Sequence, residues 1–271
     1  NALDDEVTDE LLGVIRQFEQ DATVRGFVIV GYGSRAFCAG ADIGRFPEML
    51  GSLSDCVQYS RDCSRLLVHL DRMTKPVVAA LNGMALGGGV ELALRCRGIV
   101  ATRETWLQFP EVTLGIAPGI GGMVVPYRRW PQAASVFHDM LRLGRKLDAA
   151  RAHALGVVDA LVGPEDDLIA SAVSRVGELS GAAGSAADLD GPVEIPMPSE
   201  LDDGAFGKRP LSREVIGIID QAIVAAAQAD GLEVALEIGY AAFGATACTE
   251  AAREGVTAFL EKRRPDFART G

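Results

Sequence analysis

The sequence of 271 residues predicts an α/β fold in which helices cover a parallel sheet. Two observations indicate this class. Short apolar segments of strand length alternate with longer segments of helical spacing, and the strand segments are apolar at every position rather than at alternate ones. Strands that are apolar on both faces are typical of a parallel sheet covered on both sides.

The first hundred residues alternate helix and strand. Apolar residues recur at helical spacing between positions 3 and 20, and a buried strand is predicted at Phe27–Val30. Helical spacing returns over 54–72 and ends before Lys75-Pro76. Two more buried strands then follow, at Val77–Leu81 and at Ile99–Ala101.

The rest of the chain is predicted to be mainly helical. Helical segments are expected at 121–130, 132–143, 148–155, 168–179 and within 212–262. Residues 181–210 interrupt this pattern with five Gly, four Pro and six acidic residues against two basic ones, which predicts an irregular acidic connector. We therefore expect a core over 1–180, the connector over 181–210, and a C-terminal helical region of the same domain over 211–271.

The charge and the cysteines exclude several classes of protein. Thirty-seven acidic residues against 26 Lys and Arg give a net charge of −11, which argues against nucleic-acid binding but allows a local site for one small anion. No apolar run approaches the roughly 18 residues of a membrane helix, and no secretion signal opens the chain, so we expect a cytoplasmic protein without membrane contact. Five cysteines without a C-x-x-C pair favour reduced thiols over structural zinc.

The three histidines also give no sign of a metal site. His69, His138 and His153 lie in predicted helices without metal-ligand spacing, so we expect packed or helix-face positions and no bound metal.

The segment Gly31-Tyr32-Gly33-Ser34-Arg35-Ala36 matches the dinucleotide fingerprint G-x-G-x-x-A after a strand. A Rossmann dehydrogenase would open a helix inside this motif. The residues that follow, Phe37 to Asp42, are instead predicted to continue as a loop of small residues. We therefore favour a tight turn without a ligand.

A second glycine run, Leu86 to Glu91, lies between a buried strand and a helical segment. Glycines there let the backbone approach a ligand closely, and a helix start directs free N–H groups and a positive dipole end at it. The run lacks the Lys-Ser/Thr of a phosphate loop, so stabilisation of a developing oxyanion fits better. Tight packing of helix on strand is the alternative.

Two carboxylates accompany these signals. Glu91 is placed in the first turn of the helix after the glycine run, and Glu111 follows Phe109-Pro110, a rigid turn. By itself, a glutamate at a helix start is often only a partner of the dipole, and one after proline is often only solvated. Periodicity does not bring the two together in space.

Taken together, these residues resemble the crotonase superfamily, the enoyl-CoA hydratase/isomerase family. The matching stretches are Arg35–Ile43, Lys75–Gly89, Phe109–Gly119, Ala154–Asp159 and Glu254–Arg263. The resemblance implies the crotonase (ClpP-like) fold, a spiral of ββα units with a helical C-terminal region. It also implies a homotrimer or a dimer of trimers.

The resemblance further implies chemistry on an acyl-CoA thioester. Its enolate would be held by the backbone N–H groups of Ala41 and Gly88, which match the family's two donors. Glu91 and Glu111 match the hydratase pair, with Glu91 activating water at Cβ and Glu111 delivering the proton to Cα. The expected reaction is reversible syn hydration of a trans-2-enoyl-CoA to a 3-hydroxyacyl-CoA in fatty-acid metabolism, without metal or redox cofactor. Cys38, near Ala41, is expected to be a packed thiol.

The remaining expected contacts are with the substrate and its CoA. They are assigned by the resemblance to Ala39, Asp42, Ile43, Arg45, Gly87, Phe259 and Lys262. Arg45 stands near where many members have Lys, and a solvated loop arginine is the alternative for it. Phe259 and Lys262 match residues that reach CoA across a subunit boundary in some hydratases, and a plain helix face is the alternative there.

Two other functions and one fusion stay open. A Δ3,Δ2-enoyl-CoA isomerase would use Glu111 alone, and a non-catalytic CoA-ligand or assembly module would need neither carboxylate. The family's preceding strand is absent before Asn1, which is not Met, so the chain is expected to begin inside a longer product. A fused or associated NAD-dependent 3-hydroxyacyl-CoA dehydrogenase would account for this.

Overall fold

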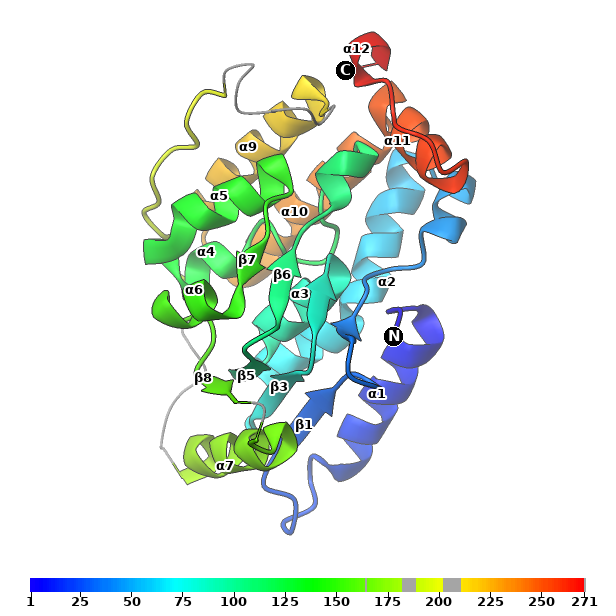
Figure 1. Cartoon of the computed structure of the whole chain (residues 1–271). Helices are drawn as coiled ribbons and strands as arrows, with labels where there is room; N and C mark the ends of the chain where they lie inside the picture. The colour runs from blue at the N-terminus through cyan, green and yellow to red at the C-terminus, as the bar shows by residue number, and fades with distance from the viewer. Residues whose placement is uncertain (164, 182–188, 202–210, 271) are drawn as a thin grey trace. The chain divides into compact units, whose positions relative to one another are not determined.

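A computed structural model describes residues 1–163, 165–181, 189–201 and 211–270 of the chain (Figure 1). The Cα positions divide into two compact units. The first unit lies within residues 1–41, 63–107 and 147–188, and the second lies within 42–62, 108–146 and 189–271.

A four-stranded parallel sheet, here called sheet A, forms the centre of the first unit. Its order is β1 (Phe27–Val30), β3 (Val77–Leu81), β5 (Gly98–Thr102) and β8 (Ala160–Val162). The predicted strands at 27–30, 77–81 and 99–101 are therefore confirmed. All five residues of β3 are buried, as expected of a central strand, whereas β1 lies at an edge and is only partly buried.

Helix α7 (Leu168–Gly181) packs on one face of sheet A and closes an aliphatic core. Alternate residues of the strands point toward it, because successive strand side chains face opposite sides of a sheet. The buried members of this core are Val78, Ala80, Val100, Val162, Ala172 and Val176.

A second sheet, here called sheet B, is built from very short strands. Its order is β2 (Ala36–Cys38), β4 (Met84–Leu86), β6 (Trp106–Gln108) and β7 (Leu147–Asp148). Strands β2 and β4 are parallel, and β6 and β7 are antiparallel. The prediction of continuous loop from Phe37 to Asp42 is wrong for the strand β2, because pairing with β4 extends a segment too short to show a strand pattern.

Sheets A and B are linked by a repeated connection. β1 is followed directly by β2, β3 by β4, and β5 by β6. Helix α3 (Gly88–Arg95) follows β4. This strand-strand-helix repeat is the expected ββα spiral. The first turn explains Gly31, because a Cβ there would lie 2.6 Å from Cα of Phe37. The glycine serves a close chain crossing, in agreement with the tight turn expected for the G-x-G-x-x-A segment.

Polar contacts fix the helices of the first unit. The side chain of Asp4 accepts from the N–H of Val7 at 2.8 Å and caps α1 (Asp5–Phe18), and Asp148 caps α6 (Ala149–Ala154). The buried Arg95 of α3 donates from Nε to Asp71 near the end of α2 (Leu53–Arg72), at 2.9 and 3.0 Å to the two carboxylate oxygens.

The second unit is helical. It contains η1 (Ile43–Glu48), η2 (Glu111–Leu114), α4 (Val125–Arg129), η3 (Pro131–Ala133), α5 (Ala134–Leu143), α9 (Arg213–Gln228), α10 (Leu232–Ala247), α11 (Glu250–Leu260) and α12 (Phe267–Thr270). The helical C-terminal region is thus confirmed. The helix expected over 121–130 is shorter than predicted, because it begins only at Val125, after two consecutive glycines and just before Pro126.

The described part of the connector, residues 189–201, has no helix or strand and is held by basic side chains. Arg128 donates to the carbonyls of Leu189 and Gly191 at 2.6 and 2.8 Å. His138 Nε2 donates to the carbonyl of Pro196 at 3.0 Å, so its Nδ1 accepts from the hydroxyl of Tyr127 at 2.8 Å. Burial lowers the pKa of His138, which therefore favours the neutral ring.

The described residues contain neither a candidate membrane span nor a candidate metal cluster. None of the described helices is long and apolar enough to cross a membrane. Among the same residues, no group of three or more His, Cys, Asp or Glu side chains is arranged to hold a metal ion.

Candidate active site

The glycine run forms the uncapped start of α3 in the first unit. Gly87 adopts φ 49°, a left-handed value that favours glycine, and no side chain caps the helix. The N–H groups of Val90 and Glu91 both donate to the carbonyl of Gly87, at 2.8 and 3.1 Å. The N–H of Gly88 precedes them, where a helix has no internal acceptor to offer. This end of α3 therefore presents backbone donors and the positive end of a helix dipole.

The loop after β2 packs against this helix start. A Cβ on Gly40 would lie 3.0 Å from the carbonyl oxygen of Leu86 and 3.8 Å from the nitrogen of Gly88. A Cβ on Gly89 would lie 2.6 Å from Cβ of Cys38. The structure thus brings the two segments that carry Ala41 and Gly88 into direct contact within one unit.

Cys38 is part of this contact. Its side chain is buried, and burial raises the pKa of its thiol, which disfavours the nucleophilic thiolate at neutral pH. The expected packed thiol is in keeping with both observations.

Glu91 lies in the first turn of α3, as predicted, and is only 3% exposed. A carboxyl group at this position is chemically able to exchange a proton with bound water.

Glu111 belongs to the second unit. It opens η2 after Pro110 and is partly buried, with its Oε2 atom enclosed. The turn is fixed by Thr113, whose hydroxyl donates to the carbonyl of Pro110 at 2.6 Å, and by Gly115 at φ 70°. Glu91 and Glu111 therefore come from different units, and their joint action stays a prediction.

The expected CoA-binding residues fall in both units. Ala39 and Gly87 belong to the contact described above. The side chain of Asp42 has a hydrogen-bond partner close in sequence, since it accepts from the N–H of Gly44 at 2.9 Å and caps η1. Ile43 lies in the same short helix, and the side chain of Arg45 lies outside the described part of the chain.

The last two expected CoA contacts lie at the end of α11. Phe259 is 54% exposed, and Lys262 is exposed just beyond the helix at φ 57°. Lys262 takes the left-handed position that commonly ends a helix, usually as glycine. Both side chains are therefore accessible to a ligand.

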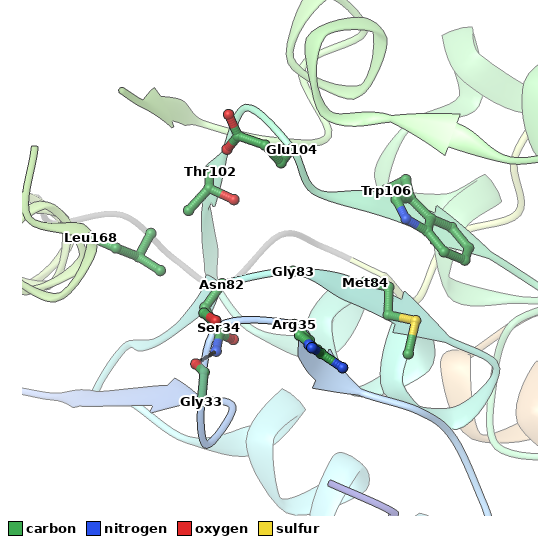
Figure 2. A pocket seen from close by; sticks show the side chains of 10 residues that line it. All are labelled: Gly33, Ser34, Arg35, Asn82, Gly83, Met84, Thr102, Glu104, Trp106 and Leu168. Carbon is green, nitrogen blue, oxygen red and sulfur yellow. Dashed lines mark hydrogen bonds between the residues drawn. The ribbon is translucent and has the colours of Figure 1, made fainter. Parts of the chain in front are cut away.

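A cavity of about 430 Å³ lies elsewhere in the first unit (Figure 2). It is lined by Gly33, Ser34, Arg35, Asn82, Gly83, Met84, Thr102, Glu104, Trp106 and Leu168. This wall lies at the amino ends of β2, β4 and β6, whereas Ala39 and Gly87 follow the carboxyl ends of β2 and β4. Within the described part of the chain, the lining of this cavity includes none of the predicted site residues.

Asn82 shapes the turn beside this cavity and is not among the site residues predicted from the sequence. Its side chain donates to the carbonyls of Gly31 and Gly33, at 2.7 and 2.5 Å, and accepts from the N–H of Gly31 at 3.2 Å. The Asn82-Gly83 dipeptide directly after a strand is a turn signal, but the partners of its side chain lie about 50 residues away.

Comparisons with known proteins agree with this architecture. A family model described as "Enoyl-CoA hydratase/isomerase" matches residues 1–189. The mitochondrial enoyl-CoA hydratase of Pongo abelii is 30% identical over 98% of this chain and 79% of its own length. The crotonyl-CoA hydratase of Syntrophomonas wolfei is also 30% identical, over 98% and 89%.

A crystal structure shows the same fold. The enoyl-CoA hydratase from Rhodobacter sphaeroides has a TM-score of 0.75 at 22% identity, covering 98% of this chain and 85% of that one. With a family model over two thirds of the chain and relatives that span nearly all of it, this protein belongs to the enoyl-CoA hydratase/isomerase family, the crotonase superfamily.

Proposed function

We propose that this protein is an enoyl-CoA hydratase, which adds water reversibly and in syn geometry to a trans-2-enoyl-CoA. The observation that carries the proposal is the contact between the Ala39–Ala41 loop and the start of α3, with the buried Glu91 in the first turn of that helix. Backbone donors at a helix start suit the negative charge that develops on a thioester oxygen. The adjacent buried carboxyl supplies a group for proton transfer from water.

The proposed reaction divides the work between backbone and carboxyl groups. Glu91 takes a proton from water as the water oxygen bonds to Cβ, and the electron pair of the double bond moves onto the thioester oxygen. The N–H groups of Ala41 and Gly88 stabilise that enolate. Glu111 then delivers its proton to Cα as the carbonyl reforms. Exchange with solvent returns both glutamates to their starting states. Each backbone N–H donor to an enolate of this kind typically contributes a factor of about 10²–10³ in rate.

Substrate binding is proposed to use the expected CoA contacts. Backbone and side-chain groups of Ala39, Asp42, Ile43, Arg45, Gly87, Phe259 and Lys262 would hold the thioester and its CoA, with no separate cofactor. A homotrimer or dimer of trimers, a cytoplasmic location, and a fused or associated 3-hydroxyacyl-CoA dehydrogenase complete the proposal. A native subunit mass near 28.6 kDa would contradict the fusion.

The decisive experiment follows the loss of conjugated thioester absorbance with crotonyl-CoA. Glu91→Gln and Glu111→Gln are each expected to lower kcat by about 10²–10⁴-fold, the range for general acid–base groups. Glu104→Gln is the matched control, an exposed glutamate of the first unit that is expected to leave kcat unchanged.

Two outcomes would contradict the proposal. Full hydration by both glutamine variants would refute the assigned roles. Isomerisation of a 3-enoyl-CoA that survives Glu91→Gln, without hydration by the unaltered protein, would assign the chain to the isomerases instead.

A further inference from the structure

The first residues of the chain are bonded to the loop that carries Ala41. The N–H of Ala39 donates to the carbonyl of Asn1 at 2.8 Å, and the N–H of Leu3 donates to the carbonyl of Gly40 at 2.9 Å. The side chain of Leu3 is 7% exposed, so it anchors this segment in the apolar interior. Two backbone hydrogen bonds therefore hold the two residues that precede Ala41.

The side chain of Asn1 holds the other end of β2. Its Nδ2 donates to the carbonyl of Tyr32 at 2.9 Å and to the carbonyl of Ala36 at 2.7 Å. Both amide hydrogens are thus directed at the turn that leads into the strand. Asn82 holds the same turn from the neighbouring strand and lies beside Gly33 and Ser34 in Figure 2.

Strand β2 needs this support because its own pairing is weak. It has only three residues, and its register with β4 shifts between Ala36 and Cys38. A strand of about 10 Å with an irregular ladder has few hydrogen bonds to fix its direction. Asn1 contacts both ends of β2 and is therefore placed to fix, together with Asn82, where the strand delivers the loop.

We propose that Asn1 is a positioning residue for the backbone N–H of Ala41. This inference rests on the proposed function, since Ala41 is there one of the two donors to the enolate. Asn1 does not touch the reacting atoms and acts only through the loop. Loss of its side-chain bonds leaves the chemical groups in place and displaces one donor, so kcat falls and substrate binding is nearly unchanged.

The test uses Asn1→Ala, Asn1→Asp and Asn1→Gln in proteins that are otherwise identical. Asn1→Asp retains the shape but replaces the donor nitrogen Nδ2 by a carboxylate oxygen, which repels the carbonyls of Tyr32 and Ala36. We expect kcat to fall about tenfold in Asn1→Ala and at least as far in Asn1→Asp, with KM within about twofold. Asn1→Gln keeps a donor amide and recovers part of the loss. Thr23→Ala, which removes an exposed hydrogen bond to Asp21 in the same unit, is the matched control.

A second measurement reports the donors without turnover. Acetoacetyl-CoA forms an enolate that absorbs in the near ultraviolet, and the enolised fraction when bound measures the strength of the oxyanion site. This fraction is expected to fall in Asn1→Ala and Asn1→Asp, in parallel with kcat. A thermal unfolding midpoint for each variant separates loss of the fold from loss of positioning.

The outcomes separate this inference from the proposed function. An unchanged enolised fraction in Asn1→Asp, or an increase in KM alone, would overturn the positioning role. An unaltered protein that enolises bound acetoacetyl-CoA without hydrating crotonyl-CoA would overturn the hydratase proposal and leave the positioning role supported if the variants lose the enolate. If the unaltered protein does not enolise the probe, both proposals are wrong.

Discussion

Substitution of Gly89 by alanine tests the contact on which the candidate site depends. An added Cβ would lie 2.6 Å from Cβ of Cys38, 2.7 Å from its carbonyl oxygen and 2.9 Å from its sulfur. Carbon atoms in contact normally lie about 3.5–4.0 Å apart, so the start of α3 and the end of β2 must separate by about 1 Å. The carbonyl belongs to the backbone, so a change of rotamer at Cys38 does not relieve the clash.

Gly89→Ala is expected to lower both the stability of the protein and its kcat. Overpacking of this kind costs about 1–3 kcal/mol of unfolding free energy. A displacement of about 1 Å between Ala41 and Gly88 is expected to lower kcat about 10²-fold, because the two proposed donors would have to reach one oxygen. Crotonyl-CoA hydration and urea unfolding measure the two effects separately.

Two further variants sharpen this prediction. Gly13→Ala is the control, because nothing lies within 4 Å of a Cβ in the middle of α1, and the change is expected to stabilise the protein slightly. In the pair Gly89→Ala and Cys38→Gly, the contacts with Cβ and sulfur disappear, so part of the loss is regained. If Gly89→Ala keeps kcat within about twofold of the unaltered protein, the two segments do not jointly form the site.

Three other perturbations follow from buried polar groups. Asp71→Asn removes the carboxylate that neutralises Arg95, whose side chain is only 1% exposed. This change is expected to lower the free energy of unfolding in urea by about 3–5 kcal/mol. The control Asp9→Asn, at an exposed ion pair, should lower it by at most about 1 kcal/mol. Burial lowers the pKa of His138 from its ordinary 6.5, so the unfolded chain binds a proton that the folded protein excludes. The free energy of unfolding should therefore decrease as the pH falls below 6.5, and a pH series on His138→Gln should lack that part of the slope. Burial, with a smaller effect of neighbouring Cys248, raises the pKa of Cys56 to about 11. Mass spectrometry after alkylation of the folded protein at pH 8 should leave Cys56 unmodified until denaturant is added.

Long apolar strands could be predicted from the sequence because burial on both faces leaves a local signal. Val77–Leu81 is fully buried in the structure, and its apolar run carries that information. Ala36–Cys38 carries none, since three residues are too few to show a period, and only its pairing with Met84–Leu86 makes it a strand. For the same reason, the loop predicted from Phe37 to Asp42 wrongly includes the last two residues of this strand.

The candidate site also has parts that could be predicted from the sequence and parts that could not. Glycines and a carboxylate next to a helix start, as in Gly87–Glu91, form a local pattern with a physical meaning. The contact of that helix with Cys38 and Gly40 is not local, because about 50 residues separate the two segments. The side-chain bonds of Asn1 to Tyr32 and Ala36 have no sequence signal at all, since an asparagine before a helix is ordinary.

The register of sheet A has a consequence for how the chain reaches its native state. Val78 pairs with Gly98, which is close to it in sequence. The pairs of Val28 with Val78 and of Val100 with Ala160 join residues that are much further apart in the sequence. Parallel pairs that close long loops form late, because loop entropy is lost before their contacts are gained. The β3–β5 pair is therefore the expected nucleus, and the two edge strands assemble on it. In pulsed hydrogen exchange during refolding, backbone amides of β5 should become protected before those of β8.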